Sequence, residues 1–413
     1  MIRTPAVLRI ATLAISTLLV TAACGGDSGS VDTGGLTGDP IKVAVIGDVT
    51  SSAGFSWSGI PKVIEQAARQ VNEDGGIDGR PIELVECDLQ NLPDQAVACS
   101  RKAVGEKVAV ALVQVIAGGQ KIPPIMEQGK TAYMPAATTD LKDLNSDVAF
   151  PMTTNVVMTI GAGYLAGQHC EKPVVVGVQN PAFDSIKELS TLGLSAAGKP
   201  PAKIVTVPVG ATDWAPTVAQ INSENPDCIV PFMSETLVQA LYPALIQSGW
   251  KTDDTRLIGH FGATYSPLIA EEFPELLEGG IFSNSSYPYT DEKWADFQKI
   301  ADGLEGQKLT NLSGSYTRGS YLNFKAFVDV AKRVAEDGDE VNNETILAKF
   351  RSTTDIDTDG LLPPVDTSKP FDDKYARMFN RSVIFEEFKD GKLTPMDGGD
   401  FTDLTDMIAK HLN

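Results

Sequence analysis

The residue types that most often carry enzyme chemistry are scarce in this sequence. Its 413 residues include three histidines, His169, His260 and His411. Histidine is the commonest general base and metal ligand of proteins, so there is little material for a histidine-based catalyst. The sequence also has no Gly-x-Ser-x-Gly nucleophile motif, no phosphate loop ending in Gly-Lys-Ser/Thr, and no His-Glu-x-x-His zinc motif. We therefore predict that the protein is not an enzyme and needs no cofactor.

One acidic segment has the spacing of a calcium loop. Residues 355–366 read DIDTDGLLPPVD, with three aspartates at alternate positions, then a glycine, and an aspartate at the final position. Carboxylates at these intervals are typical of the helix–loop–helix calcium site. Three features argue against calcium here: the last ligand is Asp where that site has Glu, two prolines occupy the exit, and no second helix is evident. We expect no metal in this segment, and calcium-dependent melting would reverse that interpretation.

Composition narrows the class of protein further. The chain is 42% hydrophobic and 21% charged, which is typical of a globular protein with a sizeable core. It carries 34 Lys and Arg against 54 Asp and Glu, a net charge of −20. So acidic a chain repels phosphate backbones and anionic lipid surfaces, and we expect no nucleic-acid partner. The length predicts two or three domains.

The N-terminus has the pattern of an export signal. Residues 1–23 contain two arginines, the short apolar stretch Ile10–Val20 and a pair of alanines. Cys24 follows and resembles the acylated cysteine of the bacterial lipoprotein signal, although Thr21 stands where that signal usually has Leu. The alternative is an ordinary secretory cleavage site. We predict lipidation of Cys24, a flexible linker over 24–39, and a location on the outer face of the cell membrane.

Export also bears on the other four cysteines. An even number of cysteines in an oxidising compartment favours disulfides. Cys87 ends a strand-like run and Cys99 lies on the helix predicted after it, whereas Cys170 and Cys228 each precede an apolar run. The local pairings are Cys87–Cys99 and Cys170–Cys228. The alternative is four buried thiols.

From residue 41 onward, short apolar runs alternate with helical patterns. The apolar runs lie at 41–47, 81–87, 108–115, 131–137, 173–178, 203–207, 228–232 and 256–260. The helical patterns lie at about 60–73, 93–105, 120–128, 157–169, 185–197, 214–222, 236–248, 292–304 and 320–336. Continuous apolar strands between helices are typical of parallel sheets covered on both faces. The pattern restarts after residue 151, so we predict an α/β protein of two doubly wound parallel-sheet lobes, with a C-terminal hairpin turning at Asp390-Gly391.

We divide the chain at the restart. The first lobe is expected to comprise 40–153 with about 286–340. The second is expected to comprise 154–285 with about 341–413, including the hinge. Ligands of open α/β sheets bind beyond the carboxyl ends of the strands, so the loops there are the candidate site. Those of the first lobe are rich in small residues, and those of the second carry large apolar side chains.

Several segments resemble the leucine/isoleucine/valine-binding family of solute-binding proteins for ABC importers. They are IKVAVIGDVT, VNEDGGIDGRPIELVECD with QAVACSRKAV after it, and MPAATT. The resemblance extends from about Ile41 to the C-terminal hairpin. It implies a type I periplasmic-binding fold, in which two lobes joined by three crossovers close around a small molecule by hinge motion. It also implies an ABC permease and its ATPase as partners, and a monomeric protein.

Only some of the family's ligand-binding positions hold matching residues in this sequence. Amino-acid binders of the family hold the ligand carboxylate with a Ser-rich loop after the third strand and an Ala-Ala-Thr loop after the fourth. Ala136, Ala137 and Thr138 match the second loop, but 116–119 read IAGG where hydroxyls are expected. The family's acidic residue for the ligand ammonium falls near Phe261, and two aromatic positions fall near Phe183 and Met233. The full set of predicted ligand-binding residues is Phe55, Trp57, Ala117, Gly118, Ala136, Ala137, Thr138, Phe183, Met233 and Phe261.

The missing acidic residue has a physical consequence. Burying an ammonium group without an acidic partner costs several kcal/mol. We therefore predict an apolar or aromatic ligand without a free ammonium group, bearing a carboxylate or an amide. Backbone N–H groups at 118–120 and the Thr138 hydroxyl would receive its oxygen. Structural roles compete with these assignments, because Trp57 would also cover a helix and Thr138 would also cap one.

Three other functions stay open at this point. The first is a ligand-sensing lipoprotein that transports nothing, and the second is a true branched-chain amino-acid or amide binder. The third is an exported hydrolase on the same scaffold, since spacing alone does not exclude a carboxylate pair. Neighbouring permease and ATPase genes would favour import over sensing.

Overall fold

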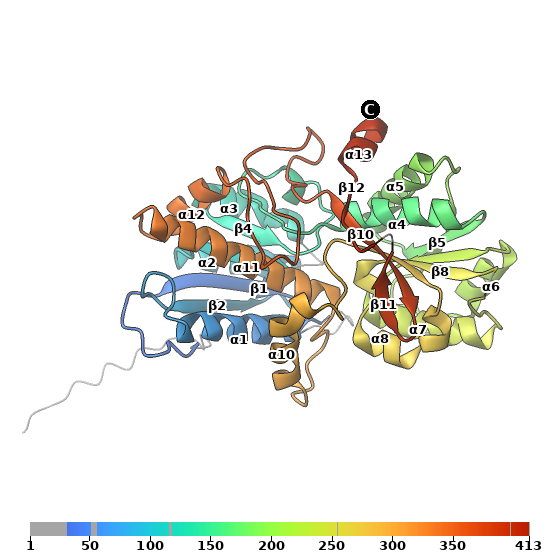
Figure 1. Ribbon diagram of the computed structural model, residues 1–413, viewed down its shortest axis with the longest axis horizontal. Helices are drawn as coiled ribbons and strands as arrows, with labels where there is room; N and C mark the ends of the chain where they lie inside the picture. The colour runs from blue at the N-terminus through green and yellow to red at the C-terminus, as the bar shows by residue number, and fades with distance from the viewer. Residues whose placement is uncertain (1–30, 51–55, 115–117, 254, 397, 413) are drawn as a thin grey trace, which may run out of the picture.

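The chain folds into two α/β lobes, seen side by side in Figure 1. The computed structural model describes residues 31–50, 56–114, 118–253, 255–396 and 398–412. The signal 1–23, Cys24 and the start of the linker therefore lie outside the described residues. Within the described part, no helix is both long and apolar enough to cross a membrane.

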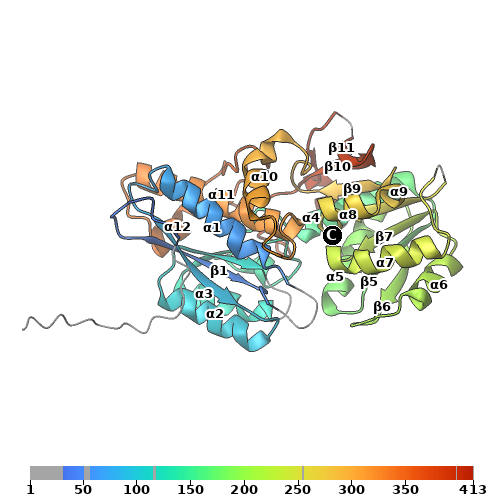
Figure 2. The ribbon, with the colours of Figure 1, turned by 90° about the horizontal axis from the view of Figure 1, so that it is seen from below.

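The first lobe is built on a parallel four-stranded sheet in the order β2-β1-β3-β4. Its elements are β1 (Ile41–Gly47), α1 (Gly59–Glu73), β2 (Ile82–Asp88), α2 (Pro93–Gly105), β3 (Val110–Gln114), the 3-10 helix η1 (Gly119–Lys121), α3 (Pro123–Gly129) and β4 (Ala132–Pro135). Helices α1 and α11 (Ser315–Glu336) cover one face of the sheet, while α2 and α3 cover the other (Figure 2). The strands are buried on both faces, as their continuous apolar runs predicted.

The second lobe contains a larger sheet in the order β11-β10-β9-β8-β7-β5-β6. Its elements are α4 (Asn155–His169), β5 (Pro173–Val178), α5 (Pro181–Ala196), β6 (Lys203–Val207), α6 (Ala215–Ser223), β7 (Cys228–Phe232), α7 (Glu235–Gln247), β8 (Leu257–Phe261), η3 (Gly262–Thr264), α8 (Pro267–Glu272), α9 (Pro274–Leu277), β9 (Ile281–Asn284), β10 (Ser382–Lys389), β11 (Lys392–Pro395), β12 (Thr402–Asp403) and α13 (Thr405–Leu412). Strands β5 to β9 are parallel, and β10 runs antiparallel to β9 and β11. The hairpin turn at Asp390-Gly391 is confirmed, with φ of 51° and 79°, as a two-residue turn with both central residues at positive φ requires.

The chain passes between the lobes three times, which confirms the predicted fold class. The crossovers lie between β4 and α4, between β9 and η4 (Glu292–Trp294), and between α12 (Asn343–Phe350) and β10. Helix α12 packs on α11 and β4 of the first lobe, although the sequence pattern assigned residues from 341 onward to the second. The reason is its apolar face, where Phe350 stacks on Phe150 with ring centroids 4.8 Å apart.

Several helices begin at residues that are typical N-caps. Thr154 caps α4, and Asn180 caps α5 by accepting a hydrogen bond from the Phe183 N–H. Asn342 and Thr345 form a capping box at the start of α12. These caps fix where the helices begin relative to the strand ends, and so position the loops between them.

Both predicted disulfides are confirmed. Cys87 pairs with Cys99 inside the first lobe, with Cα atoms 5.6 Å apart. Cys170 pairs with Cys228 inside the second lobe, with Cα atoms 5.8 Å apart. Each disulfide therefore links elements of one lobe and leaves the two lobes free to move relative to each other.

Candidate functional site

The first two turns of α11 lie where the two lobes meet. Tyr316 packs against the hydrophobic cores of both lobes. Gly314, which caps α11, faces Glu235 at the start of α7 in the second lobe. We call this region, around residues 314–322, the lobe junction.

Trp57 contacts the lobe junction from the first lobe. Its side chain is buried, and its ring lies 5.4 Å from that of Tyr316 in an edge-to-face arrangement. Asn155, at the start of α4, donates from Nδ2 to the Tyr316 hydroxyl at 3.5 Å. Burial raises the pKa of Tyr316, and the Asn155 hydrogen bond opposes that rise. Side chains from three separate segments therefore converge at the junction.

The Ala-Ala-Thr loop lies beside the same helix. A Cβ placed on Gly319 would lie 3.6 Å from the Ala136 Cβ. Ala137 takes a positive φ of 53°. The Thr138 hydroxyl donates to Asp143 Oδ2 at 2.8 Å and accepts from the Asp140 N–H at 3.0 Å. The single hydrogen of Thr138 is therefore used within its own loop.

Asp143 is the buried centre of that loop. Burial raises its pKa to about 7, while the Thr138 hydrogen bond acts in the opposite direction. The Tyr133 hydroxyl also donates to it, at 2.9 Å. The loop is thus held by its own hydrogen bonds.

The other predicted residues have varied positions. Gly118 has φ 78°, and a Cβ there would lie 2.6 Å from the Pro93 Cα, so this close approach to α2 requires glycine. Phe183 packs on Gly177 in one hydrophobic cluster of the second lobe, and Met233 belongs to another. Phe55, Ala117 and the side chain of Phe261 lie outside the described residues.

The sequence analysis missed four buried polar atoms, three at or just after the ends of β3 and β7 and one at the start of α4. Among the described residues these atoms have no hydrogen-bond partner: Gln114 Oε1, Asn155 Oδ1, Ser234 Oγ and Glu235 Oε2. Gln114 ends β3, Asn155 begins α4, and Ser234 and Glu235 follow β7. An unpaired buried polar atom costs about 1–3 kcal/mol, so such atoms call for an explanation.

Glu235 is the acidic member of this set. Its side chain is 9% exposed, and its Oε2 lies 3.1 Å from the position of a Cβ on Gly314. Burial raises its pKa, while a hydrogen bond from Ser266 and the charge of Arg318 act against that rise. Its position directly after a strand was the one sequence signal available.

A cavity of about 240 Å³, including the part open to solvent, adjoins the lobe junction. It is lined by Thr153, Met158, Asn284, Ser285, Ser286, Ser315, Arg318, Gly319 and Leu322. Arg318 is 2% exposed and donates from Nη1 to the Ser313 carbonyl at 3.2 Å. Its guanidinium lies over the rings of Tyr289 and Trp294, at 5.5 and 5.8 Å. Burial lowers the pKa of Arg318, but a guanidinium stays charged in proteins.

The carboxyl group of Glu386, on β10, lies close enough to Arg318 to raise the pKa of the guanidinium. Its side chain is completely buried, and Oε2 accepts from Asn284 Nδ2 at 3.1 Å. Burial raises its pKa to about 8, and both Asn284 and Arg318 oppose this. At neutral pH the group is therefore mainly uncharged.

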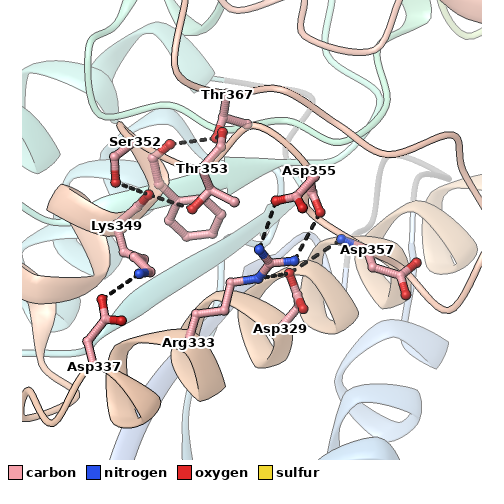
Figure 3. A network of polar contacts seen from close by, with 10 residues as sticks. Asp329, Arg333, Asp337, Lys349, Ser352, Thr353, Asp355, Asp357 and Thr367 are labelled. Carbon is pink, nitrogen blue, oxygen red and sulfur yellow. Dashed lines mark hydrogen bonds and ion pairs between the residues drawn. The ribbon is translucent and has the colours of Figure 1, made fainter.

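The acidic segment 355–366 is bound to α11 by ion pairs (Figure 3). Arg333 contacts Asp329 at 2.9 Å and Asp355 at 2.8 Å, and Asp359 pairs with Lys325. The described residues contain no cluster of three or more His, Cys, Asp or Glu side chains placed to hold a metal ion. The first and third aspartates of the segment thus have protein cations as partners.

Comparison with known families accounts for most of the chain. Residues 40–389 match a family described as periplasmic binding proteins. Two doubly wound lobes joined by three crossovers define this class, and the chain belongs to the periplasmic binding protein family. The predicted type I periplasmic-binding fold is confirmed. No curated protein sequence matches the chain.

Solved structures share the fold at low sequence identity. A fatty acid ABC transporter substrate-binding protein from Thermomonospora curvata is 18% identical, with a TM-score of 0.72 over 92% of this chain and 96% of that one. A leucine-binding protein from Thermotoga maritima is 19% identical, with a TM-score of 0.67 over 89% and 99%. A solute-binding protein of an ABC transporter from Rhodopseudomonas palustris, in complex with 3,4-dihydroxybenzoic acid, is 16% identical, with a TM-score of 0.69 over 89% and 98%. At such identities the similarity establishes the fold alone.

Proposed function

We propose that this protein is an extracytoplasmic solute-binding protein that captures a small organic solute between its lobes and delivers it to the permease and ATPase of an ABC importer. The observation that carries this proposal is the set of unpaired buried polar atoms contributed by both lobes, at Gln114, Asn155, Ser234 and Glu235. A solute that bridges them binds the closed arrangement more tightly than the open one. It therefore shifts the population toward the closed form, which the permease recognises.

The proposal includes a lipid anchor at Cys24. The export pattern of residues 1–23 and the Gly-rich linker 24–39 support it. The anchor would keep a monomeric receptor close to its permease. Intact-mass analysis of the protein from membranes would detect the added diacylglyceryl group, and a mature protein of unmodified mass would refute the anchor.

We propose an apolar or aromatic acid without a free ammonium group as the solute. Arg318 supports the acid, because it is a buried cation beside the cavity at the lobe junction. Trp57 and Tyr316 support an apolar body, because their rings meet at the same junction. The names of two structural neighbours, a fatty acid transporter component and a complex with 3,4-dihydroxybenzoic acid, point the same way.

Glu235 favours a second candidate, a branched-chain amino-acid or amide binder. Its buried carboxyl has an oxygen without a partner, which an ammonium or amide N–H would supply. The raised pKa reduces its negative charge and so weakens this candidate. The leucine-binding neighbour is consistent with it.

Isothermal titration would separate the two candidates. The panel would contain leucine, isoleucine and valine, together with benzoate, 4-hydroxybenzoate, 3,4-dihydroxybenzoate and octanoate. We expect an acid from this panel to bind and the three amino acids not to bind. X-ray scattering should then show a smaller radius of gyration with the bound acid, because the lobes close around it.

Glu235→Gln provides the matched control. It keeps the shape of the side chain and removes the charge, so binding of an amino acid would fall sharply while binding of an acid would persist. Tight binding of any branched-chain amino acid would refute the proposed solute class. An unchanged radius of gyration with every solute would refute capture by lobe closure.

A further inference from the structure

Arg318 is the one buried cation that faces the cavity at the lobe junction, among the residues that the structure describes as lining it. We propose that Arg318 is the anchor for the carboxylate of the solute, and that the carboxylate end of the solute enters this cavity. This inference rests on the proposed function and adds the residue that selects an acid over its neutral analogue.

The guanidinium is buried without an adequate partner. A buried charge costs a great deal of free energy unless it is paired. Among the described residues no ion pair joins Arg318 to a carboxylate within 4 Å, and its Nη1 donates to the Ser313 carbonyl at 3.2 Å. The ring faces of Tyr289 and Trp294 provide a smaller attraction. An incoming carboxylate would supply the missing opposite charge.

Two carboxyl groups, Glu386 and Glu235, act electrostatically on Arg318, but neither forms an ion pair with it. Glu386 has its Oε2 bound to Asn284, and it is mainly uncharged at neutral pH because burial raises its pKa to about 8. The free Oε2 of Glu235 lies against Gly314, one helical turn before Arg318. Tyr265 and Tyr289 are the other titratable groups that influence Arg318, and burial raises the pKa of both, so they are neutral as well.

The rest of the cavity lining also suits a carboxylate. Thr153, Ser285 and Ser315 contribute hydroxyl groups, which can donate to carboxylate oxygens, whereas the Ser286 hydroxyl donates to the Tyr287 carbonyl at 3.5 Å. Guanidinium–carboxylate hydrogen bonds are charge-assisted and among the strongest in proteins. The free space of the cavity in this arrangement of the lobes is about 10 Å³, room for one water-sized sphere and far below the ~300–1,000 Å³ of whole-ligand pockets, so the cavity admits the end of a solute only when its lining moves apart. It reaches Ser315, next to Tyr316, whose ring meets that of Trp57.

The Thr138 hydroxyl, the anion donor predicted from the sequence, is less suited to this role. It already donates its single hydrogen to Asp143 at 2.8 Å. A solute oxygen would have to compete with a buried carboxyl for that hydrogen. Arg318 has several donors and a permanent charge, so the structure favours it as the anchor.

The test compares each acid with its amide in the wild-type protein and in Arg318→Gln. The probes are benzoate with benzamide, and octanoate with octanamide, measured by titration calorimetry. We expect wild type to prefer the acid and Arg318→Gln to lose about 10- to 100-fold in affinity for it, the range that hydrogen bonds to charged groups usually provide. Affinity for the amide should stay within a few-fold. Arg318→Lys should recover part of the acid affinity, because it restores the charge without the guanidinium geometry.

Arg381→Gln is the control for removing a partly buried arginine near the hinge. Arg381 hydrogen-bonds Thr405 and the carbonyls of Met378 and Phe379, and it does not line the cavity. Its loss should leave the acid-to-amide ratio unchanged. If Arg318→Gln does not fold, Arg318→Lys makes the same comparison, with a reduced acid-to-amide ratio expected.

Two results would overturn the assignment to Arg318. One is equal binding of acid and amide, or no acid binding at all, by the wild-type protein. The other is an acid-to-amide ratio that the Arg318 variants leave unchanged. Neither result removes the proposed function if another solute, such as leucine, still closes the lobes in scattering, so the two failures are distinguishable.

Discussion

Single buried side chains give the junction its chemistry. Arg318, Glu235 and Glu386 come from three distant parts of the chain, and burial shifts the pKa of each toward its uncharged form. Desolvation is the largest cause in every case. Desolvation at the junction therefore makes a charged side chain costly in free energy. A solute carboxylate that pairs with Arg318 would recover part of that free energy.

Glu386 makes a prediction for the pH dependence of stability. Its pKa is about 8 in the folded protein against an ordinary value of 4.5. The folded state therefore holds the proton to higher pH than the unfolded state does. The stabilisation is fully present below pH 4.5 and is lost as the pH rises from 4.5 to 8, at up to about 1.4 kcal/mol per pH unit. Glu386→Gln should remove this part of the pH dependence.

Thermal unfolding of wild type and Glu386→Gln at pH 5, 6, 7 and 8 would measure this pH dependence of stability. Asp143 adds a similar fall up to about pH 7, so the difference between variant and wild type is the quantity to compare. Glu387→Gln is the matched control, because neighbouring side chains of a strand point to opposite faces and Glu387 is only partly buried. Parallel curves for Glu386→Gln and wild type would contradict the prediction.

Among the secondary-structure elements, helix α11 contributes to the lobe junction, to the core of the first lobe and to the binding of the acidic segment. Its first turns form the lobe junction, its buried face packs on the first-lobe core, and its later turns bind the acidic segment 355–366. Arg333 joins Asp329 on its own helix to Asp355 on the segment, and it also donates to the Asp355 carbonyl (Figure 3). Asp355, the first aspartate of the calcium-like spacing, is therefore held in an ion pair with this helix.

Arg333→Gln should loosen this segment. We expect a loss of about 1 kcal/mol in the free energy of unfolding, the upper part of the range for partly exposed ion pairs. Hydrogen exchange should become faster over residues 353–367. Arg69→Gln is the control, because Arg69 makes a more exposed pair with Glu73 at 3.7 Å and should cost less. Stabilisation of the wild-type protein by calcium would contradict this account, since Arg333 and Lys325 already neutralise Asp355 and Asp359.

At the scale of the whole molecule, function depends on how closely the lobes can approach. The disulfides lie within the lobes, and the contact between lobes at Glu235 and Gly314 is close. Gly314 has φ −66°, a backbone conformation open to any residue. The absence of a side chain therefore matters here for space.

Gly314→Val should hinder closure. A Cβ at this position would lie 3.1 Å from Glu235 Oε2, and the branched side chain adds further atoms. Overpacking of this kind costs about 1–3 kcal/mol, so we expect solute affinity to fall about tenfold, with a larger radius of gyration and an unchanged melting temperature. Gly303→Val is the control, because a Cβ there has no neighbour within 4 Å. Equal solute affinity in both variants would refute the idea that closure needs glycine at 314.

Much of the fold follows from local patterns. The apolar runs at 41–47, 173–178, 203–207 and 228–232 are the strands β1, β5, β6 and β7 with the predicted bounds. Both disulfides pair cysteines of neighbouring elements, and the Asp390-Gly391 turn has its usual geometry. The strands, the turn and the Cys87–Cys99 pairing depend on residues close in sequence, whereas Cys170 and Cys228, 58 residues apart, are brought together by the pairing of β5 with β7. The short strand β9 had no such signal and was missed.

The sequence by itself determined the two-lobed architecture, because hydrophobic periodicity records which face of each element is buried. Only the tertiary structure decided the site. Arg318 lies within a long amphipathic helix, where an arginine is ordinarily a surface residue, and Glu235 and Glu386 follow or occupy strands far away in the chain. Their burial and their proximity arise from the packing of two lobes against each other. No local pattern encodes that packing, because it depends on contacts between residues many positions apart.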